Sequence, residues 1–273
     1  GTALPGEGVM AVACLACGDD ALLLAAATSS GLLHGWRLQA DALLKGSAPQ
    51  EAALTARGAS TAALAARCFP APLPSKPPGV IVGAADGTVS LGGLGELLEP
   101  AGSARPALQP WLETRLHEAG VNDISVCATW GEEGALLVAT AGDDQQIILL
   151  ALSFEASLGS QVHVSLRGSR RVLQAHASSV RALSWASSLL LSLGLDRRLR
   201  VWGLKAGADD DNGSASCPQL LEVAVPHVVR CTEPAALAVA VEAVVRSGGS
   251  EYSPVACAGR GVELAAVRQG GHS

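Results

Sequence analysis

The chain has 273 residues, of which 49% are apolar and 16% are charged, and its formal net charge is −6. This length and apolar content allow a sizeable buried core, which excludes intrinsic disorder. The acidic balance argues against nucleic-acid binding through the whole surface. The longest apolar runs, such as residues 21–27, are too short to cross a bilayer, so we expect no membrane association.

Four segments share one pattern, in which an apolar run is followed by a turn of Gly, Asp or Ser residues and then by a second apolar run. In chain order they are ALLLAAATSSGLLHGWRL (21–38), GVIVGAADGTVSLGGL (79–94), ALLVATAGDDQQIILLAL (135–152) and LLLSLGLDRRLRVWGL (189–204). Each segment predicts a β-hairpin. Their corresponding positions, Trp36, Gly92, Leu150 and Trp202, lie 56, 58 and 52 residues apart (92−36, 150−92, 202−150), which indicates a repeat architecture.

The two later hairpins are each preceded by a histidine and a further predicted strand. Val121 follows His117 by four residues, and Val180 follows His176 by the same distance. Short strands recur along the chain, with no convincing helical period between them. We therefore expect an all-β fold built from repeated units.

The last repeat carries four residues whose spacing fits one hydrogen-bonded chain. A histidine before the first strand, a serine on the second, an aspartate in the turn and a tryptophan on the third can bond in sequence and fix the register of a blade. The residues in these places are His176, Ser192, Asp196 and Trp202. Serine, histidine and aspartate also form catalytic triads, but a nucleophilic serine needs an exposed elbow, and Ser192 lies within an apolar strand. We therefore interpret the set as structural.

These residues resemble the WD-repeat family, and the segment from His176 to Leu204 is the best match. The preceding repeat keeps part of the pattern, with His117, Thr140, Asp144 and, in the tryptophan place, Leu150. The resemblance implies a WD-repeat β-propeller of about four to five blades. Because a closed ring commonly has seven blades and about 300 residues, we expect the chain to be the C-terminal portion of a larger protein.

The repeats suggest a division of the chain. The propeller portion is expected to span residues 1–265. We expect degenerate repeats at 1–110, clearer repeats at 111–204, an acidic loop at 206–218, a terminal blade at 219–265 and a tail at 266–273.

The order of features between Trp111 and Leu264 narrows the resemblance within the family. The stretches HEAGVNDISV, LLVATAGDDQQIILLAL, LQAHASSVRALSW, LLLSLGLDRRLRVWGL, VAVPHVV and CAGRGVEL follow one another. This succession is similar to the WD-repeat accessory subunits of tRNA wobble-ribose 2′-O-methylation. The similarity implies a non-catalytic, cytoplasmic partner of an FtsJ-like tRNA methyltransferase. S-adenosylmethionine and the catalytic residues would then belong to that enzyme, and tRNA would be the shared substrate.

No motif of the chain predicts an enzyme, a cofactor site or a metal site. Gly259 and Gly261 form a G-x-G without a third glycine, which is typical of a strand turn rather than of a phosphate cradle. Cys14 and Cys17 form a C-x-x-C pair, but a zinc site needs a second pair, so we interpret them as small buried hydrophobes on a strand. The seven scattered cysteines favour a reducing, intracellular compartment.

Basic residues gather in one part of this acidic chain. Between Gln161 and Lys205 there are seven arginines and one lysine, with Asp196 as the one acidic residue, which gives a local charge of +7 (8−1). The loop entering the first strand and the turn between the second and third strands should lie at one end of a blade, so that Arg170, Arg171, Arg197 and Arg198 converge. Such a face would hold tRNA phosphates. The alternatives are a dock for an acidic protein partner and an ordinary solvated edge of the blade. The alternative, a general WD-repeat interaction scaffold, rests on the fold alone.

Overall fold

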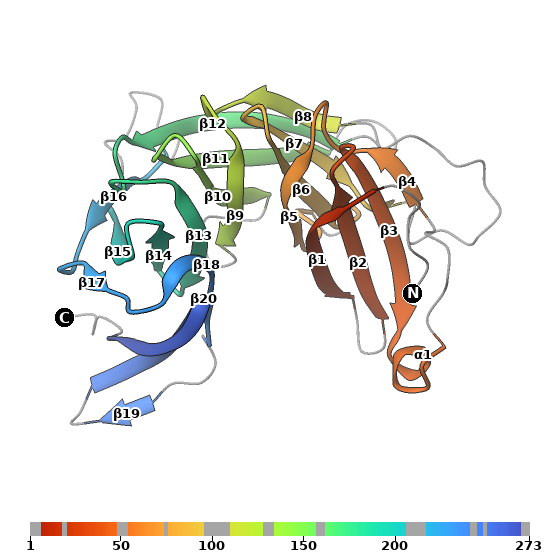
Figure 1. Cartoon of the computed structure of the whole chain (residues 1–273). Coiled ribbons are helices and arrows are strands. Elements are labelled where there is room, and N and C mark those ends of the chain that lie inside the picture. The colour runs from red at the N-terminus through yellow and green to blue at the C-terminus, as the bar shows by residue number, and fades with distance from the viewer. Residues whose placement is uncertain are drawn as a thin grey trace. The chain divides into compact units, whose positions relative to one another are not determined.

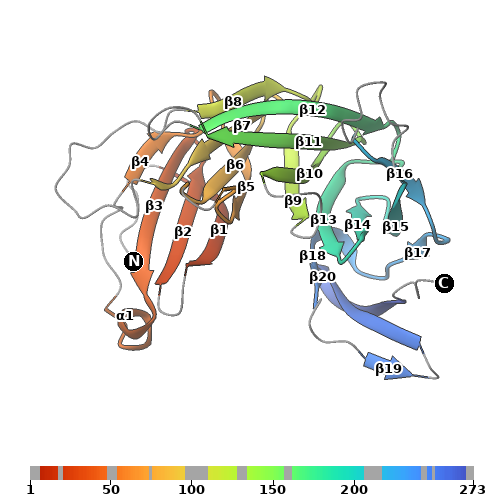
Figure 2. The same cartoon turned by 180° about the vertical axis from the view of Figure 1, so that it is seen from behind.

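A computed structural model of the protein describes residues 7–17, 21–47, 54–73, 76–95, 110–127, 134–156, 162–205, 217–240, 245–247 and 250–268. The chain divides into two compact units. The first contains residues 1–124, 132–135 and 152–166, and the second contains residues 125–131, 136–151 and 167–273. Figure 1 shows the strands labelled in chain order, and Figure 2 shows them from behind.

The described strands form five sheets. The first sheet holds β1 (Val9–Cys17), β2 (Ala21–Thr28), β3 (Leu32–Gln39) and β4 (Leu54–Arg57), and the second holds β5 (Ala63–Phe69), β6 (Gly79–Ala84), β7 (Thr88–Gly93) and β8 (Pro110–Arg115). The third holds β9 (Val121–Cys127), β10 (Ala135–Gly142), β11 (Ile147–Ala156) and β12 (Val162–Val172). The fourth holds β13 (Val180–Ala186), β14 (Leu189–Gly194), β15 (Arg198–Lys205), β16 (Gln219–Glu222) and β17 (His227–Val228). The last sheet has the order β18 (Thr232–Val239), β20 (Ser250–Arg268), β19 (Val245–Ser247).

The second and third strands of the first four sheets are joined by one kind of tight turn. Its last residue has a left-handed backbone each time, with φ of 80° at Gly31, 86° at Gly87, 66° at Gln145 and 59° at Arg197. The amide of each of these residues donates to the carbonyl oxygen three residues earlier, at 3.0 to 3.3 Å. The four positions lie 56, 58 and 52 residues apart, which is the spacing of the hairpins in the sequence. The prediction of an all-β fold of the WD-repeat β-propeller class with about four to five blades is confirmed.

The turn predicts opposite effects for two substitutions. Arg197→Gly should raise the free energy of unfolding by about 0.5 to 1 kcal/mol, because a residue with a Cβ is strained in the left-handed region. Gly87→Ala should lower it by about 1 kcal/mol or more, because the new Cβ would overlap the backbone carbonyl oxygen of His117. Urea unfolding of both variants at unchanged m-value measures the two differences. A destabilised Arg197→Gly protein would contradict this account of the turn.

Each unit buries apolar side chains between its strands. In the first unit, a cluster rich in alanine is completed by Leu23, Leu33, Val80, Val82 and Leu94. In the second unit, one cluster contains Leu137, Leu149, Leu190 and Trp202, and another contains Leu191, Leu193 and Val255. Burial of these side chains removes apolar surface from water and stabilises the sheets.

The structure differs from the sequence expectation at several element boundaries. A short helix, α1 (Ala40–Leu44), follows β3, where no helical period was recognised. Within 219–265, expected to form one terminal blade, β16 pairs with β15 of the fourth sheet, while β18 to β20 form the last sheet. Strand β20 continues to Arg268, into the expected tail, and residues 206–216 of the acidic loop lie outside the described residues. No helix within the described ranges is long and apolar enough to cross a membrane.

Candidate functional site

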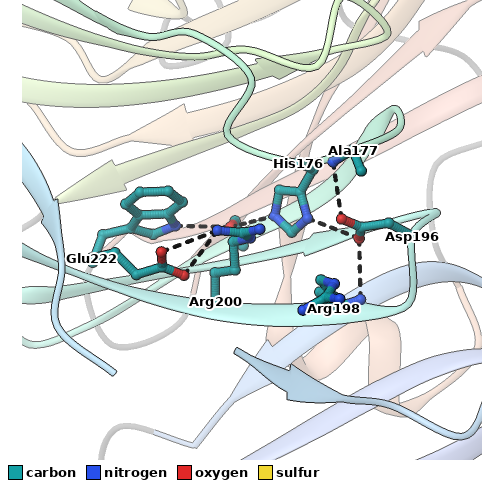
Figure 3. Close-up of polar contacts among 8 residues, drawn as sticks. His176, Ala177, Asp196, Arg198, Arg200 and Glu222 are labelled. Atoms are coloured by element: carbon teal, nitrogen blue, oxygen red, sulfur yellow. Dashed lines mark hydrogen bonds and ion pairs between the residues drawn. The ribbon is translucent and has the colours of Figure 1, made fainter. Parts of the chain in front are cut away.

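The four residues expected to bond in sequence are joined in the fourth sheet and the loop before it (Figure 3). The indole Nε1 of Trp202 donates to Ser192 Oγ at 2.8 Å. Ser192 Oγ lies 2.7 Å from His176 Nε2, and His176 Nδ1 lies 2.9 Å from Asp196 Oδ1. The spacing in the sequence therefore corresponds to a continuous polar chain through the sheet.

Asp196 also holds the turn together. Its carboxylate accepts from the backbone N–H of Ala177 at 3.0 Å and from that of Arg198 at 3.1 Å, in addition to the histidine (Figure 3). The preceding loop and the turn between β14 and β15 are thus fixed to one side chain.

The hydrogen bonds of the polar chain all run in one direction, from Trp202 towards Asp196. An indole N–H can only donate, so the serine hydroxyl accepts from Trp202 and donates its own hydrogen to His176 Nε2. The imidazole then carries its hydrogen on Nδ1, which donates to the ionised Asp196. Because Ser192 is fully buried and His176 is 1% exposed, neither can reach a substrate, and the set acts on stability rather than in catalysis.

Burial sets the charge state of the histidine. Removal from water lowers the pKa of His176 below its ordinary value, against the opposing effect of the hydrogen bond that it donates to Asp196. Burial alone would raise the pKa of Asp196. The hydrogen bonds from His176, Ala177 and Arg198 outweigh this effect, so the pKa of this carboxyl lies below its ordinary value. The folded protein therefore holds a neutral imidazole against a carboxylate.

The lowered pKa of His176 predicts a pH-dependent stability. The unfolded histidine binds a proton below about pH 6.5, whereas the folded one does so only at lower pH. Stability from this group is therefore complete above about pH 6.5 and decreases as the pH falls from there towards the folded pKa. We expect a lower urea midpoint at pH 5.5 than at pH 7.5, and a smaller difference in His176→Gln. A midpoint in the wild type that rises on acidification would contradict the neutral imidazole.

The third repeat has leucine in the place of the tryptophan. Thr140, fully buried, donates to the backbone oxygen of Ile148 at 3.4 Å, and Asp144 Oδ1 accepts from the backbone N–H of Gln146 at 3.2 Å. Leu150 fills the tryptophan place and is fully buried. His117, 2% exposed, lies in the first unit, and its backbone N–H donates to Gly87 O at 3.1 Å.

Arg170 and Arg171 lie elsewhere than expected from the sequence. They belong to the last residues of strand β12 and not to the loop that enters β13. The physical reason is that β12 extends to Val172 before the chain turns. Arg197 is the left-handed turn residue, and Arg198 begins β15.

Contacts made by Arg171 and by residues near the other arginines bring the end of β12 and two turns to one edge of the second unit. We call Arg170, Arg171, Arg197 and Arg198 the arginine rim. Arg171 Nη1 donates to Gln146 Oε1 at 3.4 Å, which joins β12 to the turn between β10 and β11. Ser179 Oγ donates to Asp143 in that same turn. Since the loop 173–179 also bonds to Asp196 through Ala177, the two turns and the end of β12 share one edge.

Two further basic residues of the +7 segment are neutralised within the fold. Arg181 Nη1 lies 3.6 Å from Asp143 Oδ1, and Arg200 Nη1 lies 3.0 Å from both carboxylate oxygens of Glu222. Sequence reasoning missed the pair of Arg200 and Glu222, because it depends on β16 returning beside β15 across the segment 206–216. Such a partner gives no signal in local spacing.

The described residues contain no group of three or more metal-ligating side chains. Cys14 and Cys17 both lie on β1, as expected, but Cys14 is exposed and Cys17 half-buried. The expectation that both are buried is therefore wrong. A spacing of three along a strand places the two thiols on opposite faces of the sheet.

Comparison with known protein families finds one match, in the fourth sheet and the end of β12. Residues 167–203, which include all four residues of the polar chain, match the family described as WD domain, G-beta repeat. Together with the sheets and their repeated turns, this match supports a WD-repeat β-propeller fold.

Two further comparisons concern solved structures and curated proteins. The crystal structure of the computationally designed Ika8 protein aligns with a TM-score of 0.46 and 18% identity over 92% of this chain and 56% of that one. The chain therefore spans little more than half the length of that design. A search of curated proteins finds no match. None of these comparisons reproduces the likeness of residues 111–264 to WD repeat-containing protein 6, on which the expected tRNA role depends.

Proposed function

We propose that the chain is a non-catalytic subunit whose arginine rim binds tRNA for an FtsJ-like methyltransferase that 2′-O-methylates the wobble nucleotide. WD-repeat propellers commonly mediate interactions between macromolecules, so an interaction scaffold is the coarser statement that the fold supports. The observation that supports the finer proposal is the exposed rim of Arg170, Arg171, Arg197 and Arg198 in a chain of net charge −6.

The rim arginines are available to an anionic ligand. Within the described part of the chain, Arg170, Arg197 and Arg198 have no carboxylate within ion-pair distance of their guanidinium groups, in contrast to Arg181 and Arg200. An exposed guanidinium presents planar paired donors that fit the oxygens of a phosphate. The rim therefore supplies charge and geometry for phosphate groups.

The chemistry of the rim favours recognition of the RNA backbone over its bases. Trp185 and Trp202, the aromatic residues nearest to the rim arginines in sequence, are 8% and 4% exposed. Neither tryptophan therefore offers an exposed ring on which a base could stack. Contacts to phosphates position a nucleic acid without reading its sequence.

The proposal assigns the chemistry to the partner enzyme. The one serine, histidine and aspartate set of the fourth sheet is buried and satisfied within the blade. S-adenosylmethionine and the catalytic groups would lie on the methyltransferase, and the assembly would act in the cytoplasm. This subunit would raise the rate by holding the substrate in position.

The test replaces the two turn arginines together, as Arg197→Gly with Arg198→Ala. Glycine suits the left-handed position, so loss of charge is separated from loss of folding. We expect weaker tRNA binding and a salt dependence of log Kd that is shallower by about 1 to 2, because each phosphate contact releases counterions. Fluorescence anisotropy with labelled tRNA at two salt concentrations measures both quantities. Arg115→Ala, an exposed arginine on β8, is the matched control.

A parallel pull-down of the methyltransferase distinguishes the two classes of partner. Retained enzyme capture with weakened tRNA binding supports the proposal. Unchanged tRNA affinity and salt slope overturn the RNA role of the rim. If the double variant also loses the enzyme under these conditions, the rim is a dock for an acidic protein surface, and the general scaffold is the better description.

A further inference from the structure

The first unit contains a cavity of about 190 Å³ beside the second sheet. Strands β6 and β7 form its floor, and the segment after β4 and strand β8 form its sides. The lining residues that matter here are Ala59, Val82 and Gly92, with Ser90, Arg57 and Glu113. Nothing in the proposed tRNA role uses this site.

The cavity lies where the fourth sheet has its polar chain. Asp86 is the counterpart of Asp196, because its Oδ1 accepts from the backbone N–H of Thr88 at 3.0 Å, two residues on. Counting from these aspartates, Val82 corresponds to Ser192 and Gly92 to Trp202. The registers agree, since Val80 pairs with Gly92 as Leu190 pairs with Trp202.

The second repeat also lacks a histidine at the position that corresponds to His176. Ala59 stands four residues before β5, as His176 stands four residues before β13. The next residue again contacts the turn aspartate, since Ser60 Oγ donates to Asp86 Oδ2 at 2.9 Å where Ala177 uses its backbone N–H. The second repeat thus has alanine in the imidazole place and glycine in the indole place, and both residues line the cavity.

The size and lining of the cavity define a class of ligand. Apolar cavities of about 150 Å³ accept a benzene ring, so about 190 Å³ is enough for a somewhat larger planar ring. Val80, Val82 and Leu91 are buried and form apolar walls. In the third repeat the corresponding positions carry Thr140 and Leu150, and both side chains are fully buried.

Polar groups lie at the exposed side of the cavity. Arg57 and Glu113 are exposed, and both line it. Arg57 Nη1 donates to the Ala59 carbonyl at 3.4 Å, and Ser90 Oγ lies 3.5 Å from Glu113 Oε2. A carboxylate only accepts hydrogen bonds when ionised, so this mouth suits a ring that donates.

We propose that this cavity binds a planar aromatic ring with an N–H donor, of the indole class. The ring would occupy the space that Trp202 fills in the fourth sheet, between apolar walls, with its N–H directed to Glu113 or Ser90. A few placed polar groups in an apolar pocket are typical of small-ligand sites. The same chemistry is available from a free small molecule or from a tryptophan side chain on a partner.

Titration of the whole chain with indole, followed by ligand-observed NMR, tests the site. We expect saturable binding to the wild type and none to Gly92→Trp, because the introduced indole fills the space. Val82→Phe fills it from the floor and serves if Gly92→Trp fails to fold. Glu113→Gln should weaken binding by about tenfold, since a charge-assisted hydrogen bond becomes a neutral one.

Leu150→Met, at the corresponding position of the third repeat, is the matched control and should leave the Kd unchanged. A second titration with N-acetyltryptophanamide distinguishes the sources. Binding of both probes indicates a tryptophan side chain as the natural occupant, and binding of indole alone indicates a free small molecule. No saturable binding of either probe, or an unchanged Kd in the filled variants, overturns the proposal. The outcome is independent of the arginine rim, which lies in the other unit.

Discussion

Replacing Trp202 by alanine is expected to lower the free energy of unfolding by about 3 to 5 kcal/mol. The indole is 4% exposed and packs in a cluster with Leu190 and Leu137, so its removal leaves a large void. The change also deprives Ser192 of the N–H that donates to it at 2.8 Å. Urea unfolding followed by far-ultraviolet circular dichroism measures the difference.

Two variants calibrate this result. Trp202→Leu should cost less than Trp202→Ala, because Leu150 occupies the same position of the third repeat and is fully buried there. Trp36→Ala, at the corresponding position of the first repeat, should also cost less, because Trp36 is only half-buried. Equal losses for Trp36→Ala and Trp202→Ala would show that the polar chain gives Trp202 no special role.

Asp196→Ala is expected to lower the free energy of unfolding by about 2 to 3 kcal/mol, because it leaves three donors without their acceptor. These donors are His176 Nδ1 and the backbone N–H groups of Ala177 and Arg198. The largest cost falls on the His176 imidazole, because it is buried and water cannot replace the lost carboxylate. Thermal and urea unfolding at pH 7.5 provide the measurement.

Asp86→Ala is the matched control in the second repeat. Asp86 accepts from the backbone of Thr88 and the hydroxyl of Ser60, but no histidine stands behind it. We expect a loss of about 1 kcal/mol, since Ser60 is exposed and water can replace its bond. A loss as large as that of Asp196→Ala would mean that the turn, and not the histidine, accounts for the stability.

The hairpins and their turns were predictable from the sequence because their signals are local. The apolar runs and the turn residues recur at 52 to 58 residues, and four of the left-handed positions follow the same spacing. The polar chain was predictable for the same reason, because His176 to Trp202 lie within three consecutive strands and the loop before them.

The remaining features depend on contacts that local spacing does not reveal. Strand β16 joins the fourth sheet only because it returns to β15 after a polar segment, and its Glu222 then pairs with Arg200. The cavity is lined by Ala59, Val82 and Gly92, which stand in the second repeat where the last repeat has histidine, serine and tryptophan. None of these three residues is unusual when it is considered alone. Arg170 and Arg171 were placed in a loop because the end of a long polar strand such as β12 shows no apolar alternation.

The fourth sheet contains the buried polar chain, whereas the second sheet borders the cavity. The free energies of local opening of these two sheets should therefore differ. Native-state hydrogen exchange reports such local openings strand by strand. Amides of β14 and β15, fastened by a buried chain of side-chain hydrogen bonds, should exchange more slowly than those of β6 and β7, which border an open space. A ring that enters the cavity would act as a reversible side chain of the second repeat. Binding of the ring should slow amide hydrogen exchange in β6 and β7, even without a change in the mean position of any strand.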